Sequence, residues 1–339
     1  MKYQARPHYL YNPAFTTPEI AQVEESFLTN WLSIHEPPDE QRLFHYTTLD
    51  GMQGILNSRS LWLGHVTSLS DRSEIQYGQQ LIEEVFKEIT KQESNDILRQ
   101  FIQQLGVWIH AFAAHSMHHI FVACFCESRD LLSQWRGYAQ RGEGYCLGFE
   151  FSSVTRIASN LDNLNNAKEP YLRKVIYLPT KQKELVSSYL SSLLPAVQAA
   201  LSSSRLPKQD SMTNVTIMAI QSASILLDML FSFKHPAFVS EQEWRLVWVT
   251  RNDFEPQGVN FRERLGQLIP YRPVYIFDNL AESSRSFPLR SIGFGPLLEP
   301  LRTRATLQLL LQRMSKAVHP ISIQPSFEIF EAGFSLRPG

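Results

Sequence analysis

The sequence predicts an α+β protein, and three observations lead to this class. The chain has 339 residues, of which 43% are hydrophobic and 19% charged, so it can bury a sizeable core. Short apolar runs with the period of strands recur along it. Longer stretches with helical spacing lie between them without regular alternation, which disfavours a doubly wound parallel sheet.

Charge and cysteine content argue against a protein that mainly grips nucleic acid and against a disulfide-based scaffold. Lysine plus arginine number 32 against 33 acidic residues, so the chain has no basic surplus of the kind that grips phosphate backbones. The three cysteines, Cys124, Cys126 and Cys146, predict no disulfide framework. Cys124 and Cys126 lie two residues apart in an apolar run and therefore point the same way, as buried reduced thiols.

The sequence predicts a cytoplasmic protein. The N-terminal residues have no apolar signal-peptide core, and no stretch reaches the ~20 uninterrupted apolar residues that span a bilayer. The most apolar stretch, 217–233, includes Gln221, Ser224 and Asp228 and is predicted to form an amphipathic helix.

Residues 1–40 are predicted to form an N-terminal arm and one helix. Thr17 can cap this helix and Pro18 fits its first position. The helix should run to about Leu32, and Glu36-Pro37-Pro38 ends it.

Residues 41–335 are predicted to form a single domain around one sheet, with helical insertions near 71–119 and 181–234. The apolar run 120–126 has the character of a central strand buried on both faces. Strands are expected at 43–46, 60–64, 120–126, 145–151, 173–178, 243–250, 274–277, 290–294, 321–323 and 328–330. Helices are expected after Thr48 or Asp50, near 74–89 and 96–115, on both sides of a linker at 202–207, and at 302–316.

The first candidate site is Phe44-His45-Tyr46-Thr47-Thr48, with Trp62 one helix later. Polar residues at the end of a strand that opens onto a helix N-terminus can bind a ligand through unpaired backbone amides. The alternative is that His45 and Thr47 only cap the helix and pack at its start.

The second candidate site is the segment 132–139. Trp135 and Tyr138 are three residues apart and share a helix face, where aromatic rings suit a planar base or nicotinamide. Arg136 suits a phosphate or carboxylate. The alternative is a core helix in which Arg136 forms an ordinary salt bridge.

The third candidate site is Glu241-Gln242-Glu243 at the start of a strand. Glu241 and Glu243 project to the same side, and Arg245 on that side could hold one carboxylate ionised. The alternative is a solvated edge of charge.

The sequence predicts no metal site. His115 and His119 have the spacing of a metal-binding pair on a helix, but no glutamate stands between them in the His-Glu-x-x-His pattern. The glycine-rich motifs that bind phosphate are missing from the sequence as well.

In order and spacing, several motifs resemble the bacterial domain-of-unknown-function family 2971, over roughly residues 42–300. They begin with Phe44-His45-Tyr46-Thr47 and end with Glu241-Gln242-Glu243-Trp244-Arg245-Leu246. The motifs between these two lie at residues 54–62, 69–74, 123–127, 132–139 and 144–149.

The order of a strand-borne His, a middle aromatic segment and a late Glu also resembles the ADP-ribosyltransferase superfamily. This resemblance implies a split, mixed or antiparallel sheet and NAD as co-substrate. It implies that Glu243 is the catalytic carboxylate and that Glu241 orients an unknown acceptor, or water. It further implies that His45 contacts a ribose hydroxyl, the Tyr46–Thr47 backbone holds the nicotinamide amide, and Trp62, Trp135 or Tyr138 stacks on a ring.

Departure of nicotinamide leaves an oxocarbenium-like ribose, which a fixed carboxylate stabilises without a metal. Two alternatives remain open at this point. One is a non-catalytic module that binds a nucleotide or a protein. The other is a nuclease that uses Glu241, Glu243 and His45.

Overall fold

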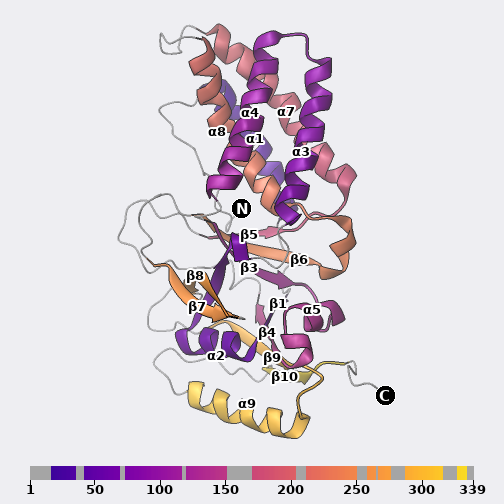
Figure 1. The fold of residues 1–339 in the computed structure, drawn as a ribbon, viewed down its shortest axis with the longest axis vertical. Coiled ribbons are helices and arrows are strands. Elements are labelled where there is room, and N and C mark those ends of the chain that lie inside the picture. The colour runs from indigo at the N-terminus through magenta and orange to yellow at the C-terminus, as the bar shows by residue number, and fades with distance from the viewer. Residues whose placement is uncertain are drawn as a thin grey trace.

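The computed structural model describes residues 17–35, 42–68, 73–116, 120–150, 170–203, 211–249, 258–264, 266–275, 287–315 and 327–333. Over these ranges the chain has the α+β organisation that the sequence predicts. A sheet occupies the middle of the molecule, with a group of long helices at one end and helix α9 (Pro300–Ser315) at the other (Figure 1).

The long helices share one hydrophobic core. They are α1 (Pro18–Ile34), α3 (Ser73–Gln92), α4 (Asp96–Ser116), α7 (Pro179–Ser202) and α8 (Ser211–Ser232). The predicted capping of the first helix is present, because Thr17 Oγ1 accepts a hydrogen bond from the amide of Ile20 at 3.5 Å. Ile20 and Trp31 are buried in this core, so α1 packs into the same layer as the two helical insertions.

Helices α7 and α8 are long and apolar enough to cross a membrane by length and composition alone. In α8, however, 83% of the most apolar window is buried inside the protein. The prediction of an amphipathic helix at 217–233 is therefore wrong, since α8 is covered on nearly every side. Its buried Asp228 has partners inside the protein, because Oδ2 accepts hydrogen bonds from Trp31 Nε1 at 2.7 Å and Arg173 Nε at 2.8 Å.

The described strands form one ten-stranded sheet in the order β10-β9-β4-β1-β3-β2-β8-β7, with β6 beside β3 and β5 beside β6. The described pairings are antiparallel except for β9 with β10, so the sheet is mixed. The strands are β1 (Arg42–Thr47), β2 (Ser60–His65), β3 (Ile120–Cys126), β4 (Tyr145–Glu150), β5 (Tyr171–Lys174), β6 (Glu243–Val249), β7 (Asn260–Arg264), β8 (Gln267–Tyr275), β9 (Leu289–Phe294) and β10 (Glu328–Glu331).

β3 is the central strand that its apolar run predicts. One edge of β3 pairs with β6 along the whole strand. The other edge is divided, because β2 pairs with Phe121 and Val122 while β1 pairs only at Cys126. β1 and β2 thus diverge along one edge of β3, and His45 directly follows Phe44, the residue of β1 that pairs with β3.

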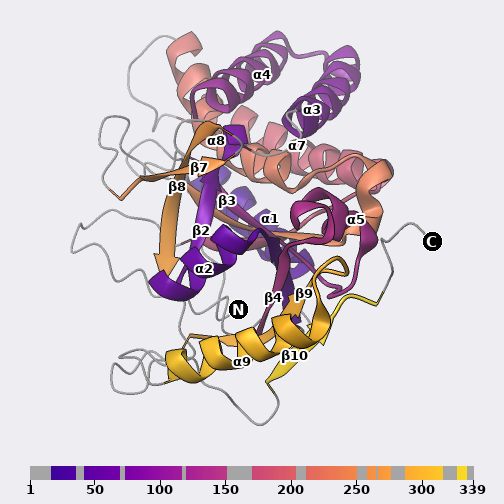
Figure 2. The same cartoon turned by 60° about the horizontal axis from the view of Figure 1, so that its bottom comes forward.

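The sheet has two faces with different cover. On the helical face, Val122 and Val247 pack into the core of the long helices, and Phe44 and Cys126 pack beneath the short helix α5 (Leu132–Gly137). On the opposite face, Phe125 shares a core with residues of α2 (Leu49–Ser58) and α9. Figure 2 shows α2 beside β2 and α9 beside β9 and β10.

The junction of β1 and α2 forms as the sequence predicts. Thr48 caps α2, because its hydroxyl accepts a hydrogen bond from the amide of Gly51 at 3.1 Å. The helix ends at Arg59, which is left-handed with φ 56°. Short 3-10 helices lie at η1 (Val66–Ser68), η2 (Gln140–Gly142) and η3 (Pro236–Glu241).

Two strand predictions need correction. The strand expected at 173–178 is β5, Tyr171–Lys174. β7 and most of β8 are missing from the prediction, because Pro270 and Pro273 interrupt the strand pattern of β8. The strand expected at 321–323 lies outside the described residues.

Candidate functional site

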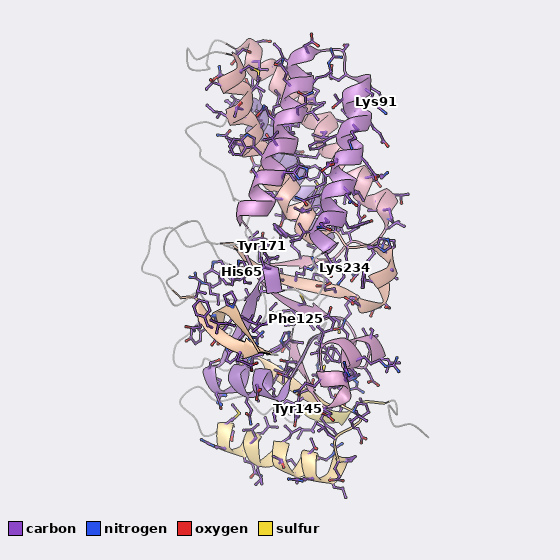
Figure 3. All side chains as sticks on the ribbon, in the orientation of Figure 1. His65, Lys91, Phe125, Tyr145, Tyr171 and Lys234 are labelled. Carbon is purple, nitrogen blue, oxygen red and sulfur yellow. The ribbon has the colours of Figure 1, made fainter. Side chains whose placement is uncertain are left out.

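Five charged side chains lie buried where the long helices meet the sheet, and Figure 3 labels Lys234 at this boundary. Glu243 and Arg245 come from β6 and Glu241 from the end of η3. Lys234 follows α8, and Glu74 lies in the first turn of α3. Each is 8% exposed or less. We refer to these five residues as the ionic cluster.

Lys234 is the centre of the ionic cluster. Its Nζ lies 2.7 Å from Glu74 Oε1, 2.7 Å from Glu241 Oε2 and 2.8 Å from Glu243 Oε2. An ammonium group has three N–H donors, so the three carboxylates use all of them.

Arg245 ties the same carboxylates to the helices. Its Nε and Nη2 donate to the two oxygens of Glu243 at 2.8 and 3.1 Å, in a bidentate pair. Nη2 also donates to Glu74 Oε2 at 2.5 Å, and Nη1 to the carbonyl oxygen of Phe231 at 3.0 Å. The arginine thereby connects β6 with α3 and α8.

The two glutamates of the Glu-x-Glu motif have opposite pKa shifts. Burial alone would raise the pKa of Glu243, but Arg245 and Lys234 outweigh it and lower this pKa to about 2. Burial raises the pKa of Glu241, and Lys234 only partly opposes this. The expectation that Arg245 holds one carboxylate ionised therefore agrees with the geometry around Glu243.

The ionic cluster has the character of a closed structural network. Both oxygens of Glu243 and both oxygens of Glu74 are bound by cations from this cluster. A solvated edge of charge, the alternative considered for Glu241 and Glu243, is excluded by their burial. A nuclease would need these carboxylates to hold a metal ion, whereas here they hold Lys234.

His45 lies on the other side of the sheet. Its neighbour Phe44 pairs with Cys126, and Cys126 pairs with Glu243. Directly paired residues of antiparallel strands share a face, and successive residues alternate, so Glu243 lies on the helical face and His45 on the opposite face. The His45 ring accordingly lies 5.6 Å from the Phe125 ring.

The resemblance to the ADP-ribosyltransferases implies that His45 and Glu243 meet in one NAD pocket. This expectation is wrong, because the two side chains lie on opposite faces of the sheet. The reason is the register of β1, β3 and β6, which the sequence does not reveal. Burial and, to a smaller extent, the charge of Arg262 lower the pKa of His45. Its Nδ1 lies 2.8 Å from the carbonyl oxygen of Cys124, which can only accept, so Nδ1 carries the proton.

A second group of side chains surrounds Trp62. Trp62 of β2 stacks on Tyr271 of β8 with ring centroids 4.5 Å apart and an interplanar angle of 29°. The guanidinium of Arg262 lies 5.6 Å from the Trp62 centroid and 5.8 Å from the Tyr271 centroid. These three residues and His45 are all half-buried. We refer to Trp62, Tyr271 and Arg262 as the aromatic–arginine site.

The other predicted binding residues do not join this site. Tyr46 lies on the helical face, where its ring meets Trp135 edge-on at 4.9 Å and its hydroxyl donates to the carbonyl of Ser128 at 3.2 Å. Trp135 is fully buried, as the core-helix alternative for this segment expects, and Tyr138 is half-buried beside it. Arg136 is exposed on α5.

Thr47 is buried, and its hydroxyl lies against Gly51, so its side chain packs at the start of α2. This is the packing role considered for it as an alternative. His110 Nε2 contacts a carboxylate oxygen of Glu83. His119, one of the two histidines with metal-pair spacing, lies outside the described residues.

Sequence reasoning missed four residues of the two groups. Glu74 and Lys234 are single charges far from the Glu-x-Glu motif, and no local pattern connects them with it. Arg262 and Tyr271 belong to strands that the prolines of β8 concealed. The only available signal was the clustering of arginine and aromatic residues at 261–275.

The fold and the two groups of residues define an α+β protein. It has a buried ionic cluster on one face of its sheet and a half-buried aromatic–arginine site on β2, β7 and β8. Residues 134–246 match the family model described as "Protein of unknown function (DUF2971)". This match covers a third of the chain and supports the resemblance to family 2971. It provides no support for the resemblance to the ADP-ribosyltransferases. No curated protein and no solved structure matches the chain.

Proposed function

We propose that the chain binds a nucleotide at the aromatic–arginine site, and that NAD is the first candidate. The observation that carries this proposal is the position of Arg262, which lies over both rings of the Trp62–Tyr271 stack. Aromatic rings stack on a base or a nicotinamide, and a guanidinium pairs with phosphate.

His45 lies outside this site, and its role as a contact for a ribose hydroxyl stays a prediction. Because Nδ1 donates to Cys124, Nε2 is an acceptor, which suits a ribose hydroxyl. The open space beside Gly64 of β2, where an added Cβ would meet nothing within 4 Å, provides room next to Tyr271, its partner in β8.

Cleavage of the nicotinamide–ribose bond by Glu243 has no geometric support. That chemistry needs a carboxylate beside the ribose, where positive charge develops. Glu243 lies on the other face from His45, and Arg245 and Lys234 already neutralise it. We therefore propose that the chain binds the nucleotide and that Glu243 does not cleave it. This proposal requires no acceptor for ADP-ribose.

The test is to measure unfolding of the full chain with and without NAD, and nicotinamide release in the same samples. At a hundred times its dissociation constant, a ligand stabilises the folded state by about 2.7 kcal/mol. We expect this stabilisation in the natural chain and in Arg136→Gln, which changes an exposed arginine far from the site. We expect Arg262→Gln to weaken NAD binding at least tenfold.

Two outcomes would overturn the proposal. If NAD, ADP-ribose and ATP all fail to stabilise the chain, the site does not bind a nucleotide. If nicotinamide is released, and a folded Glu243→Gln variant binds NAD without releasing it, then Glu243 is catalytic after all and the non-catalytic interpretation is wrong.

A further inference from the structure

Helix α9 has an outer face that combines apolar and cationic residues. Its inner face buries Leu307, Leu311 and Met314 in the core of the sheet. On the outside, Leu301 is 80% exposed and Leu309 is 68% exposed. These two leucines and the exposed Ala305 between them follow one another at intervals of four residues, so they form one stripe.

Arginines flank this stripe at both ends. Arg302 and Arg313 are exposed, and at 100° per residue they fall on the same side of the helix as Leu309. The third arginine, Arg304, donates a hydrogen bond to the carbonyl of Ile329 at 2.7 Å, so it lies toward β10 instead. α9 contains no acidic residue, so its surface is cationic although the chain as a whole has a net charge of -1.

We infer that this face of α9 is a docking surface for an acidic, amphipathic helix of another protein. The small Ala305 between two leucines leaves a notch into which a side chain of a second helix can pack. The stretch from Leu301 to Arg313 spans about 18 Å, so a helix of a few turns could place a carboxylate at each arginine.

Two other occupants fit the charges and shapes less well. A second copy of the chain would bring its own Arg302 and Arg313 against the same two arginines, and like charges repel. A membrane surface would receive only two leucines, and no aromatic residue of α9 could anchor in the headgroup region.

The test uses two synthetic helical peptides of eighteen residues, one with leucines on one face and glutamates at both ends, and one with lysines in place of those glutamates. Binding to the full chain is measured by fluorescence anisotropy. We expect the acidic peptide to bind at least tenfold more tightly than the basic one, and the double variant Arg302→Glu/Arg313→Glu to reverse this preference. Leu309→Asp should weaken binding at least tenfold, whereas Leu268→Asp, which changes a leucine 71% exposed on β8, should not.

The inference is overturned if the double variant, folded as judged by its unfolding curve, keeps the preference of the natural chain. It is also overturned if sedimentation shows a dimer that Leu309→Asp dissociates, because the occupant is then a second copy. Binding to phosphatidylserine vesicles that Leu309→Asp abolishes would assign the face to membranes instead. None of these measurements depends on the nucleotide site.

Discussion

The carbonyl oxygen of Cys124 lies 2.8 Å from Nδ1 of His45, while the thiol of the same cysteine lies on the other face of the sheet beside Glu243. One residue of β3 thus contacts both His45 and the ionic cluster. Its backbone orients the imidazole of His45, and its side chain packs against the ionic cluster. β3 separates His45 from the ionic cluster rather than joining them in one pocket.

The first prediction concerns the protonation of His45. Burial and Arg262 lower its pKa, so we expect the ring to stay neutral at pH 6.5, where an unperturbed histidine is about half charged. Nitrogen chemical shifts in a histidine-labelled sample should show the proton on Nδ1. A ring that titrates at the ordinary value, or that carries its proton on Nε2, would contradict the hydrogen bond to Cys124.

The second prediction separates the two glutamates of the Glu-x-Glu motif. A pKa of about 2 means that ionised Glu243 favours the folded state, by about 3 kcal/mol at neutral pH, and Glu243→Gln should lose this stability. Because the folded-state pKa is lowered, this contribution is present above the unfolded value and is lost as the pH falls from about 4.5 toward 2.

Glu241→Gln is the matched control for that variant. Burial raises the pKa of Glu241, so removing its charge should cost little stability or none. Urea denaturation of both variants at pH 7 measures the difference. Equal losses of stability in the two variants would contradict this prediction. They would show that Lys234 and Arg245 do not stabilise the charge of Glu243 more than that of Glu241.

The third prediction is that the protein becomes more stable on mild acidification. Burial between the helices raises the pKa of Glu24 to about 7, and hydrogen bonds from Ser222 and Tyr189 only partly oppose this. A raised carboxyl pKa favours the folded state below it, and this advantage is lost as the pH rises through 7. Stability should therefore increase by up to about 3 kcal/mol between pH 8 and pH 5.

Glu24→Gln tests the source of that effect. The amide keeps the shape and can still accept a hydrogen bond from Tyr189, but it has no charge to bury. The variant should be more stable than the natural chain at pH 8 and about equal to it at pH 5. An unchanged pH dependence would assign the effect to other groups.

The fourth prediction compares two glycines near Trp62. A Cβ on Gly54 would lie 2.0 Å from the Trp62 indole, so Gly54→Ala should displace the ring, cost about 1–3 kcal/mol and weaken nucleotide binding. Gly64 lies in β2 with open space around its missing Cβ. Gly64→Ala should therefore keep its stability, and tryptophan fluorescence should change in Gly54→Ala alone. Similar spectra for both variants would contradict the packing of α2 against Trp62.

The sequence by itself determined most of the secondary structure and the class of fold. The cap at Thr17, the cap at Thr48 and the apolar run of β3 are local signals, since each depends on residues within a few positions. The sequence also indicated that Arg245 accompanies Glu243, because the two are separated by one residue in a strand. The same local rules did not detect β7, whose partner strand contains prolines.

Only the tertiary structure decided which of these residues meet. The pairing of Phe44 with Cys126, and of Cys126 with Glu243, puts His45 on the face away from Glu243. A shift of one residue in either pairing would reverse this, because successive side chains in a strand alternate between faces. Lys234 reaches Glu74 in the same way, through the packing of α8 and α3 on the sheet, and no spacing along the chain encodes that contact.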